Sequence, residues 1–231
     1  DAFSPFYSFK LRTLENEFEK LRADILQCRK CHLWQSRHHV IFGEGHPHAG
    51  VFIIGEAPGR DEDLNGRPFI GKSGQLLDKI LFACGFSRQE HVFISNIVRC
   101  RPPDNRVPTT EEAAICLPWL MRQIELVDPK ILVFLGATAL KHMAGPEHRI
   151  TRERGQWMFW QERWAMPVYH PAALLRDPGL KRDTWEDFKK IVAKYRELVN
   201  PAILPLIAER MPVSLFCLKA RAGSSTIFPI F

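Results

Sequence analysis

The feature that most constrains the fold of this chain is an alternation of short apolar runs with amphipathic segments. Four runs rich in β-branched and aromatic residues are short enough to be buried strands. They lie at residues 51–54, 91–95, 131–135 and 166–169. Between and around them, apolar residues recur at helical spacing. This alternation predicts an α/β fold, in which helices cover both faces of a parallel sheet.

Capping residues indicate where the helices begin. Thr13, Ser73 and Asp183 are each suited to cap an amphipathic stretch. Thr109 is followed by Glu112, which is the spacing of a capping box. The expected helices are 14–26, 74–84, 109–127, 137–143 and 183–199.

The composition is that of one compact domain. Apolar residues make up 45% of the 231 residues and charged residues 25%, which excludes disorder of the whole chain. The alternating pattern runs to residue 199, whereas 200–231 contains four prolines, few charges and no sustained period. We therefore expect one domain over 1–199 and an appended tail of unknown role over 200–231.

No stretch of the sequence indicates a membrane or secretory address. No run approaches the roughly 20 apolar residues that cross a bilayer. The first nine residues lack the basic start and apolar centre of a secretory signal. We expect a cytoplasmic protein with no membrane partner. The chain begins with Asp1 rather than Met, which is compatible with a short segment before it.

Basic residues exceed acidic ones by 32 to 26, so the formal net charge is +6 with neutral histidines. This excess is compatible with a polyanionic partner but does not identify one, since many enzymes carry as much. It is concentrated in residues 141–182, which hold eight Lys and Arg, four acidic residues and three tryptophans. Both a phosphate-facing surface and an ordinary solvated face fit this segment.

Four of the six cysteines form two pairs that are far apart in sequence. Cys28 and Cys31 make a CxxC turn after the first expected helix, and Cys100 and Cys116 flank a Pro-rich loop. Four thiolates suit either tetrahedral zinc or an iron–sulfur cube, and the wide spacing of the second pair weighs against zinc. Unrelated buried thiols are the alternative. The remaining cysteines are expected to be ordinary thiols of the core and the tail, Cys84 and Cys217.

Polar residues stand where three of the expected strands end. The first strand leads toward Glu56, the second into Asn96 and the fourth into His170. Because the carboxyl ends of parallel strands meet at one edge of a sheet, these three groups should converge there. The more ordinary interpretation of Asn96 is a residue that forms a turn at the end of a strand. The more ordinary interpretation of His170 is a loop residue whose ring is hydrogen-bonded within the protein.

Three segments around these residues form a specific pattern. They are Gly55-Glu-Ala-Pro-Gly-Arg-Asp-Glu-Asp63 with its continuation to Leu77, Asn96-Ile-Val-Arg-Cys100-Arg-Pro-Pro103, and His170-Pro-Ala-Ala-Leu-Leu175. Together with the four cysteine positions, they resemble the family 4 uracil-DNA glycosylases from Leu14 to Val199. Family 5 lacks the polar side chain that Glu56 supplies. The resemblance implies a three-layer α/β/α sandwich with a four-stranded parallel sheet, and hydrolysis of the N-glycosidic bond of deoxyuridine in DNA. It also implies a 4Fe-4S cluster on Cys28, Cys31, Cys100 and Cys116.

The resemblance implies a pocket for one base extruded from the DNA, because C1′ of a stacked nucleotide is out of reach. Phe69 is placed to stack on uracil, with Ala57 in the same pocket, although a loop aromatic packed into the core is the ordinary reading. Asn96 can donate to uracil O4 and accept from N3–H, the reverse of what cytosine presents. His170 is placed to donate to uracil O2 as negative charge builds on the departing base.

Two carboxylates are the expected partners of the sugar and the attacking water. Glu56 and Glu62 are candidates for positioning water and for favouring the cationic sugar of the transition state. Glu62 can also crowd the C5 position against thymine, and Glu56 can shape the rim of the pocket. The more ordinary interpretation of the acidic run 61–63 is a turn exposed to solvent. The sequence does not identify which residue is the general base.

Three residues are expected to contact the DNA itself. Ser73 is placed at a helix N-terminus, where backbone amides bind phosphate. Leu174, or its neighbour Leu175, can wedge into the space that the base vacates, with Arg176 beside it on the backbone. We expect a monomer that removes uracil and leaves an abasic site. A non-catalytic nucleic-acid-binding or polymerase-accessory protein is the alternative, and a zinc-stapled nucleoside hydrolase is a third reading.

Overall fold

The computed structural model describes residues 5–203. The expected tail lies outside the described residues from 204 onward, and so does Cys217. In the described part of the chain, no helix is long and apolar enough to cross a membrane.

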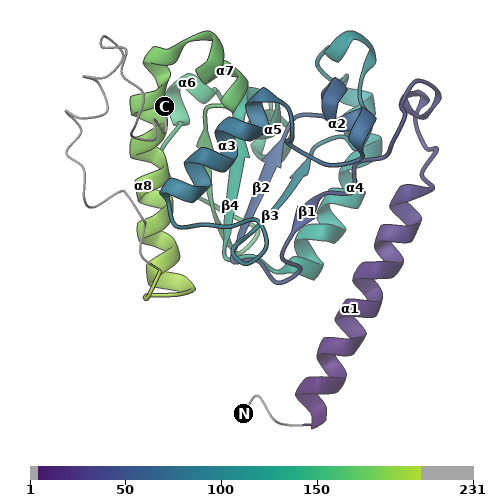
Figure 1. Ribbon diagram of the computed structural model, residues 1–231, viewed down its shortest axis with the longest axis horizontal. Coiled ribbons are helices and arrows are strands. Elements are labelled where there is room, and N and C mark those ends of the chain that lie inside the picture. Colours follow the sequence, from purple (N-terminus) through teal and green to yellow (C-terminus); the bar gives the residue numbers. More distant parts are fainter. Residues whose placement is uncertain (1–4, 204–231) are drawn as a thin grey trace, which may run out of the picture.

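A six-stranded mixed sheet forms the centre of the molecule (Figure 1). Its strands are β1 (Glu44–Gly45), β2 (Val51–Gly55), β3 (Val92–Asn96), β4 (Ile131–Leu135), β5 (Met158–Trp160) and β6 (Arg163–Val168). They follow the order β1-β3-β2-β4-β6-β5. The four inner strands are parallel, and both edge strands are antiparallel to their neighbours. The α/β class is therefore confirmed, but the four-stranded, purely parallel sheet is not.

The two strands missing from the prediction are the edge strands. β1 has two residues and β5 has three, which is too short for either to show a period of its own. Each pairs with only one neighbour, so its position depends on tertiary contacts rather than on its own sequence.

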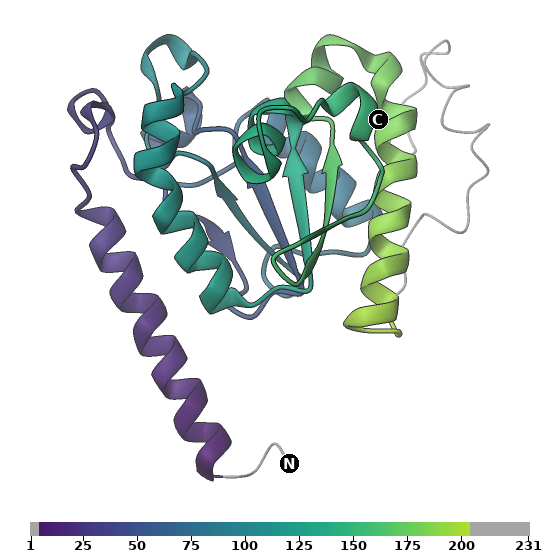
Figure 2. The same cartoon turned by 180° about the vertical axis from the view of Figure 1, so that it is seen from behind.

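Helices cover both faces of the sheet (Figures 1 and 2). They are α1 (Pro5–Leu26), α2 (Arg60–Asn65), α3 (Lys72–Ala83), α4 (Thr110–Val127), α5 (Gly136–Ala144), α6 (Ile150–Glu153), α7 (Pro171–Arg176) and α8 (Lys181–Leu198). Three short 3₁₀ turns lie at His32–Gln35, Pro103–Asn105 and Pro178–Leu180. The α2 helix contains the acidic run 61–63, for which the sequence suggested a solvated turn.

Strand β2 shows how one sequence serves two cores. Val51 and Ile53 pack into the cluster formed with α3, α7 and α8. Phe52 and Ile54 pack into the opposite cluster, formed with α1, α4 and α5. All four side chains are buried, because alternate residues of a strand point to opposite faces and both faces are covered.

Only one of the four expected caps is confirmed. Thr109 caps α4 and forms the predicted capping box with Glu112. The α3 helix begins earlier than predicted, with Gly71 as its N-cap and Ser73 in its first turn. The α8 helix likewise begins at Lys181, so Asp183 lies inside the helix, and α1 starts ahead of Thr13. Asp183 still lies in the first turn, where an acidic side chain favours the helix dipole.

Candidate functional site

A cavity of about 870 Å³ opens at the carboxyl ends of the parallel strands. Its walls come from the segments that follow β2, β3, β4 and β6. The structure brings eight of the expected site residues into this lining: Glu56, Ala57, Glu62, Phe69, Ser73, Asn96, His170 and Arg176. The expected convergence of polar groups at one edge of the sheet is thus present.

Asn96 is the last residue of β3 and is only 2% exposed. Its carbonyl accepts a hydrogen bond from Arg99 Nη1. Its side-chain Oδ1 is buried and has no hydrogen-bond partner among the described residues. Buried polar atoms are almost always paired, so an unpaired amide oxygen in a cavity wall fits a ligand donor.

Phe69 forms the neighbouring wall and lies 6% exposed. Its backbone has φ +51°, a left-handed conformation that costs a non-glycine residue about 1–2 kcal/mol. Its ring centroid lies 5.7 Å from that of His170. Gly55 makes this arrangement possible, because a Cβ there would lie 2.5 Å from both Phe69 Cζ and Asn96 Oδ1. Two walls of the pocket therefore meet over a bare glycine backbone.

His170 caps α7, and its ring has a defined tautomer. Its Nδ1 accepts a hydrogen bond from the backbone N–H of Ala172 at 3.1 Å, so the proton of the neutral ring sits on Nε2. Burial lowers the pKa of His170 to about 4, and the nearby Arg176 adds to this shift. The ring is therefore uncharged at neutral pH and offers one N–H donor.

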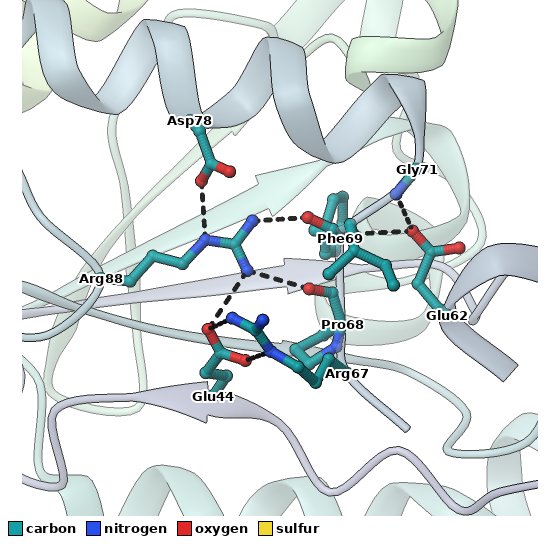
Figure 3. A network of polar contacts seen from close by, with 9 residues as sticks. Glu44, Glu62, Arg67, Pro68, Phe69, Gly71, Asp78 and Arg88 are labelled. Atoms are coloured by element: carbon teal, nitrogen blue, oxygen red, sulfur yellow. Dashed lines mark hydrogen bonds and ion pairs between the residues drawn. The ribbon is translucent and has the colours of Figure 1, made fainter. Parts of the chain in front are cut away.

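Both carboxylate oxygens of Glu62 accept hydrogen bonds from the backbone of its own loop, and Figure 3 shows those to one of the two oxygens. Oε1 accepts from the N–H groups of Ile70 and Gly71, each at 2.9 Å. Oε2 accepts from the N–H of Gly59 at 3.1 Å. These bonds tie the two ends of the segment 59–71 together, which favours a positioning role over water binding.

Glu56 is held differently. Its Oε2 accepts a hydrogen bond from the hydroxyl of Thr138, which lies in α5 and also lines the cavity. In the described part of the chain, Glu56 Oε1 accepts no hydrogen bond. The Glu56 carboxylate thus has an anchored oxygen and a second oxygen available to a ligand or water.

The residues expected to contact DNA differ in their exposure. Arg176 is exposed and Ser73 is half-buried, and both line the cavity. Leu174, however, is fully buried in the core beneath α7, which argues against a wedge at this position. Its neighbour Leu175 is 45% exposed, so the wedge hypothesis moves to Leu175. The sequence alone could not choose between Leu174 and Leu175, because helix periodicity does not tell which of two adjacent leucines faces the sheet.

The four paired cysteines lie on three segments, within electrostatic range of one another. The pKa of Cys116 is raised, mainly by burial and further by the thiols of Cys31 and Cys28. Burial likewise raises the pKa of Cys100 to about 11, with contributions from Cys116 and Cys31. In the described part of the chain, no three metal-ligating side chains are grouped so as to hold one metal ion. Cys84 is a separate, fully buried core thiol, as expected.

Two arginines border the cysteines. Arg37 Nη1 donates to Cys100 Sγ at 3.0 Å. Arg99 is fully buried, and this burial lowers the pKa of its guanidinium. The nearby thiols of Cys116, Cys100 and Cys28 raise that pKa in part. Since Arg99 also donates to the Asn96 carbonyl, the cysteine region and one wall of the pocket share a single side chain.

The structure adds pocket residues that the sequence did not single out. Thr138 comes shortly after the end of β4, and Tyr169 follows β6. Because ligands bind at the carboxyl ends of parallel strands, these positions could have been predicted to line the pocket. Arg106 lines the cavity while it pairs with the buried Glu112 at 2.6 Å. The three tryptophans of the basic segment are half-buried, and Lys194 lies 4.7 Å from the Trp164 ring centroid.

Comparisons with known proteins identify relatives of this chain. The family model described as Uracil DNA glycosylase superfamily matches residues 42–192. A type-4 uracil-DNA glycosylase of Sulfurisphaera tokodaii is 42% identical over 184 residues, which are 76% of this chain and 84% of that protein. The type-4 enzyme of Thermotoga maritima is 41% identical over 182 residues, 77% of this chain and 94% of its own. That of Archaeoglobus fulgidus is 41% identical over 177 residues, 73% and 88% respectively.

Proposed function

This chain belongs to the uracil DNA glycosylase superfamily as a type-4 enzyme that excises uracil from DNA, and from this premise we propose how its residues carry out the reaction. The substrate is a deoxyuridine extruded from the DNA, and the products are free uracil and an abasic site.

The unpaired Asn96 Oδ1 carries the proposal. Uracil offers an N3–H donor beside an O4 acceptor, which complements the oxygen and the NH2 of one amide. Cytosine has an N3 acceptor beside an N4 donor, and would leave buried groups unpaired against Asn96. The Phe69 ring stacks on the base, with Ala57 completing the slot. The pocket therefore selects uracil by hydrogen-bond pattern and by shape.

His170 supplies the main electrostatic contribution to catalysis. When the bond from C1′ to N1 breaks, negative charge accumulates on uracil O2, and His170 Nε2–H donates to it. A neutral donor prepositioned in a water-poor site needs no reorganisation as this charge appears. The fixed Nδ1 acceptor bond holds the ring in this orientation.

Glu56 is the carboxylate that orients the attacking water and stabilises the cationic sugar. The Thr138 hydroxyl anchors one of its oxygens, which leaves the other to accept from water. Glu62 acts one step removed from the reaction, by holding the loop that carries Phe69.

The DNA strand binds around the mouth of the cavity. Arg176 and the amides near Ser73 at the start of α3 contact phosphates. Leu175 occupies the space that the extruded nucleotide leaves in the stack.

We propose that Cys28, Cys31, Cys100 and Cys116 hold a 4Fe-4S cluster. One observation supports the fit: Cys31 and Cys28 raise the pKa of Cys116, and Cys116 and Cys31 raise the pKa of Cys100, so the four positions lie within electrostatic range of one another. Four thiolates of this kind suit an iron–sulfur cube, as the similarity to type-4 enzymes implies. When bound, the cluster supplies structural cross-linking of the three segments.

We also propose the oligomeric state, the location and the domain bounds of the enzyme. The enzyme acts as a monomer in the cytoplasm, the glycosylase domain spans residues 1–199, and 200–231 is an appended segment. The deoxyuridine lies in DNA rather than in a free nucleoside, since the mouth of the cavity carries the basic side chains of Arg60, Lys72 and Arg176.

An oligonucleotide with one deoxyuridine tests the function. Wild-type protein should convert it to an alkali-labile strand, and matched strands with thymidine or deoxycytidine should stay intact. Asn96→Ala and His170→Ala should lose this activity while they keep the wild-type fold by circular dichroism. Binding of the deoxyuridine strand without base release by the wild type would favour a non-catalytic DNA-binding protein instead.

A further inference from the structure

Phe69 presents its ring through a backbone conformation that is unfavourable for phenylalanine. Its φ of +51° lies in the left-handed region, which side-chain-bearing residues adopt rarely. Such a conformation at a ligand pocket persists only where surrounding contacts enforce it. The residues that provide those contacts are therefore part of the recognition apparatus, even if they never touch the base.

Arg88 provides them from one side (Figure 3). It lies between α3 and β3 and is only 8% exposed. Its Nη1 donates to the carbonyl of Pro68 at 2.9 Å, and its Nη2 donates to the carbonyl of Phe69 at 2.5 Å. One planar guanidinium thus fixes two consecutive peptide groups, which a single point donor cannot do.

The charge of Arg88 is balanced away from the base. Its Nε donates to Asp78 Oδ1 at 2.6 Å, and Glu44 lies 3.7 Å from Nη1. Glu44 is itself engaged by the exposed Arg67, at 2.7 and 2.8 Å. Arg88 is not among the residues that line the cavity, so any effect on base binding has to pass through Pro68 and Phe69.

The opposite side of the same segment is also fixed. Glu62 accepts from the N–H groups of Ile70 and Gly71, the two residues that follow Phe69. At Gly74, an added Cβ would lie 1.8 Å from the Phe69 carbonyl oxygen, so α3 packs directly against this peptide group. An anion on the amide side and a cation on the carbonyl side thus hold the Phe69 backbone between them.

We propose that Arg88 is a positioning residue for base recognition: its fork on the Pro68 and Phe69 carbonyls maintains the strained turn that aims the Phe69 ring at the base slot. The inference rests on the proposed function. Its consequence is geometric, because Phe69 Cζ and Asn96 Oδ1 both border the same point above Gly55. Movement of the ring changes the width of the slot in which Asn96 reads the base.

Two substitutions separate the fork from the charge. Arg88→Lys keeps the positive charge but cannot donate to both carbonyls as the planar guanidinium does. Arg88→Met keeps much of the side-chain volume but loses both the charge and the hydrogen bonds to the carbonyls. The control is Arg67→Met, which removes a cation from the same Glu44 but leaves both carbonyl bonds intact. The readouts are the single-turnover rate on a deoxyuridine oligonucleotide, the inhibition constant of free uracil, and the melting temperature.

Hydrogen bonds from charged donors are strong enough that Arg88→Met should lower the rate by about 10- to 100-fold and weaken uracil inhibition similarly. Arg88→Lys should fall between Arg88→Met and the wild type, and Arg67→Met should stay within about twofold. A lower melting temperature with wild-type rate and wild-type uracil inhibition would show a merely structural role and overturn the proposal.

A double-substitution cycle tests the route of the effect. If Arg88 acts through the Phe69 ring, then Arg88→Lys and Arg88→Met should change the rate of a Phe69→Ala enzyme by less than about twofold. A full additional loss in that background would overturn the proposal. Wild-type protein that releases no uracil would instead reject the proposed function itself, before any Arg88 variant is compared. If Arg88→Met does not fold, Arg88→Lys alone closes the cycle.

Discussion

Two neighbouring loops form the two walls of the base slot, and they are held in different ways. The first loop, residues 56–71 after β2, is fixed by side chains close in sequence, with Glu62 inside it and Arg88 shortly after it. The second loop, residues 97–109 after β3, is fixed by prolines and by the bond between Arg106 and Glu112. It also carries Cys100, and Cys31, which lies much earlier in the chain, contributes to the raised pKa of the Cys100 thiol.

The difference shows which wall depends on distant parts of the chain. The peptide groups next to Phe69 are held by Glu62, Arg88 and the packing of α3, while the same loop bonds His38 and His39 through Asp63. The Asn96 wall is linked through Arg99 and Cys100 to the segment 28–37, which follows α1, and to α4. Perturbing the cysteines should therefore loosen the second wall while leaving the first in place.

The largest expected effect comes from removing the reading group of the second wall. Asn96→Ala deletes both hydrogen bonds to uracil and should lower the excision rate by about 10³-fold or more. Phe69→Ala, which removes the first wall, should cost less, because stacking alone contributes about 1–3 kcal/mol per base. Single-turnover kinetics on one deoxyuridine strand measure both, and equal rates for Asn96→Ala and wild type would remove Asn96 from the pocket.

The next effect comes from the point where the two walls meet. Gly55→Ala places a Cβ 2.5 Å from both Asn96 Oδ1 and Phe69 Cζ, so one wall has to shift. A displacement of this size should lower the rate by about 10²-fold. The matched control is Gly179→Ala, outside the cavity lining, where the added Cβ meets only the exposed Asp177 side chain, at 3.1 Å. An active Gly55→Ala enzyme would show that the walls do not close on each other.

Loss of a cysteine ligand should separate the two loops. Cys28→Ala should release bound iron, lower the melting temperature and speed hydrogen exchange in 97–109, while 59–71 keeps its protection. Cys84→Ala removes a buried thiol outside the group and should retain iron. Iron content equal to wild type in Cys28→Ala would exclude this cysteine as a ligand, and uniform exchange across both loops would contradict the contrast.

A smaller effect is expected when the internal brace of the first loop is weakened. In Glu62→Gln, one amide oxygen still accepts from Ile70 and Gly71, but the NH2 group cannot accept from Gly59 N–H. The expected result is about a tenfold lower rate with raised exchange at 59–71 only. If water positioning were the role of Glu62, the rate would fall with no change in exchange.

The smallest effect concerns pH, through His170 on α7. Because its pKa is lowered to about 4, the ring stays neutral and the rate should change less than about twofold between pH 7 and pH 5. With a histidine at its ordinary pKa, the rate would fall about 25-fold over that range. The unfolded chain binds this proton more readily, so His170 lowers stability as pH falls from about 6.5 to 4, and His170→Asn should remove that slope.

Much of the site follows from strand ends, and the rest depends on tertiary contacts. Asn96 and His170 could be placed in one pocket because buried parallel strands bring their carboxyl ends together. The choice between Leu174 and Leu175 could not be made, since it depends on how α7 sits on the sheet. The left-handed turn at Phe69 was equally hidden, because the residue that enforces it, Arg88, lies 19 positions further along the chain, beyond α3.

The central claim is that the buried Asn96 amide reads the N3 edge of an extruded uracil. Substrates with deoxyuridine or 3-deaza-deoxyuridine test it, since the second has C3–H in place of N3–H and a 4-hydroxyl in place of the O4 carbonyl, with little change of shape. Wild-type enzyme should prefer deoxyuridine by about 10- to 100-fold more than Asn96→Ala does. The same preference in both enzymes would show that Asn96 does not meet N3, and would contradict the account.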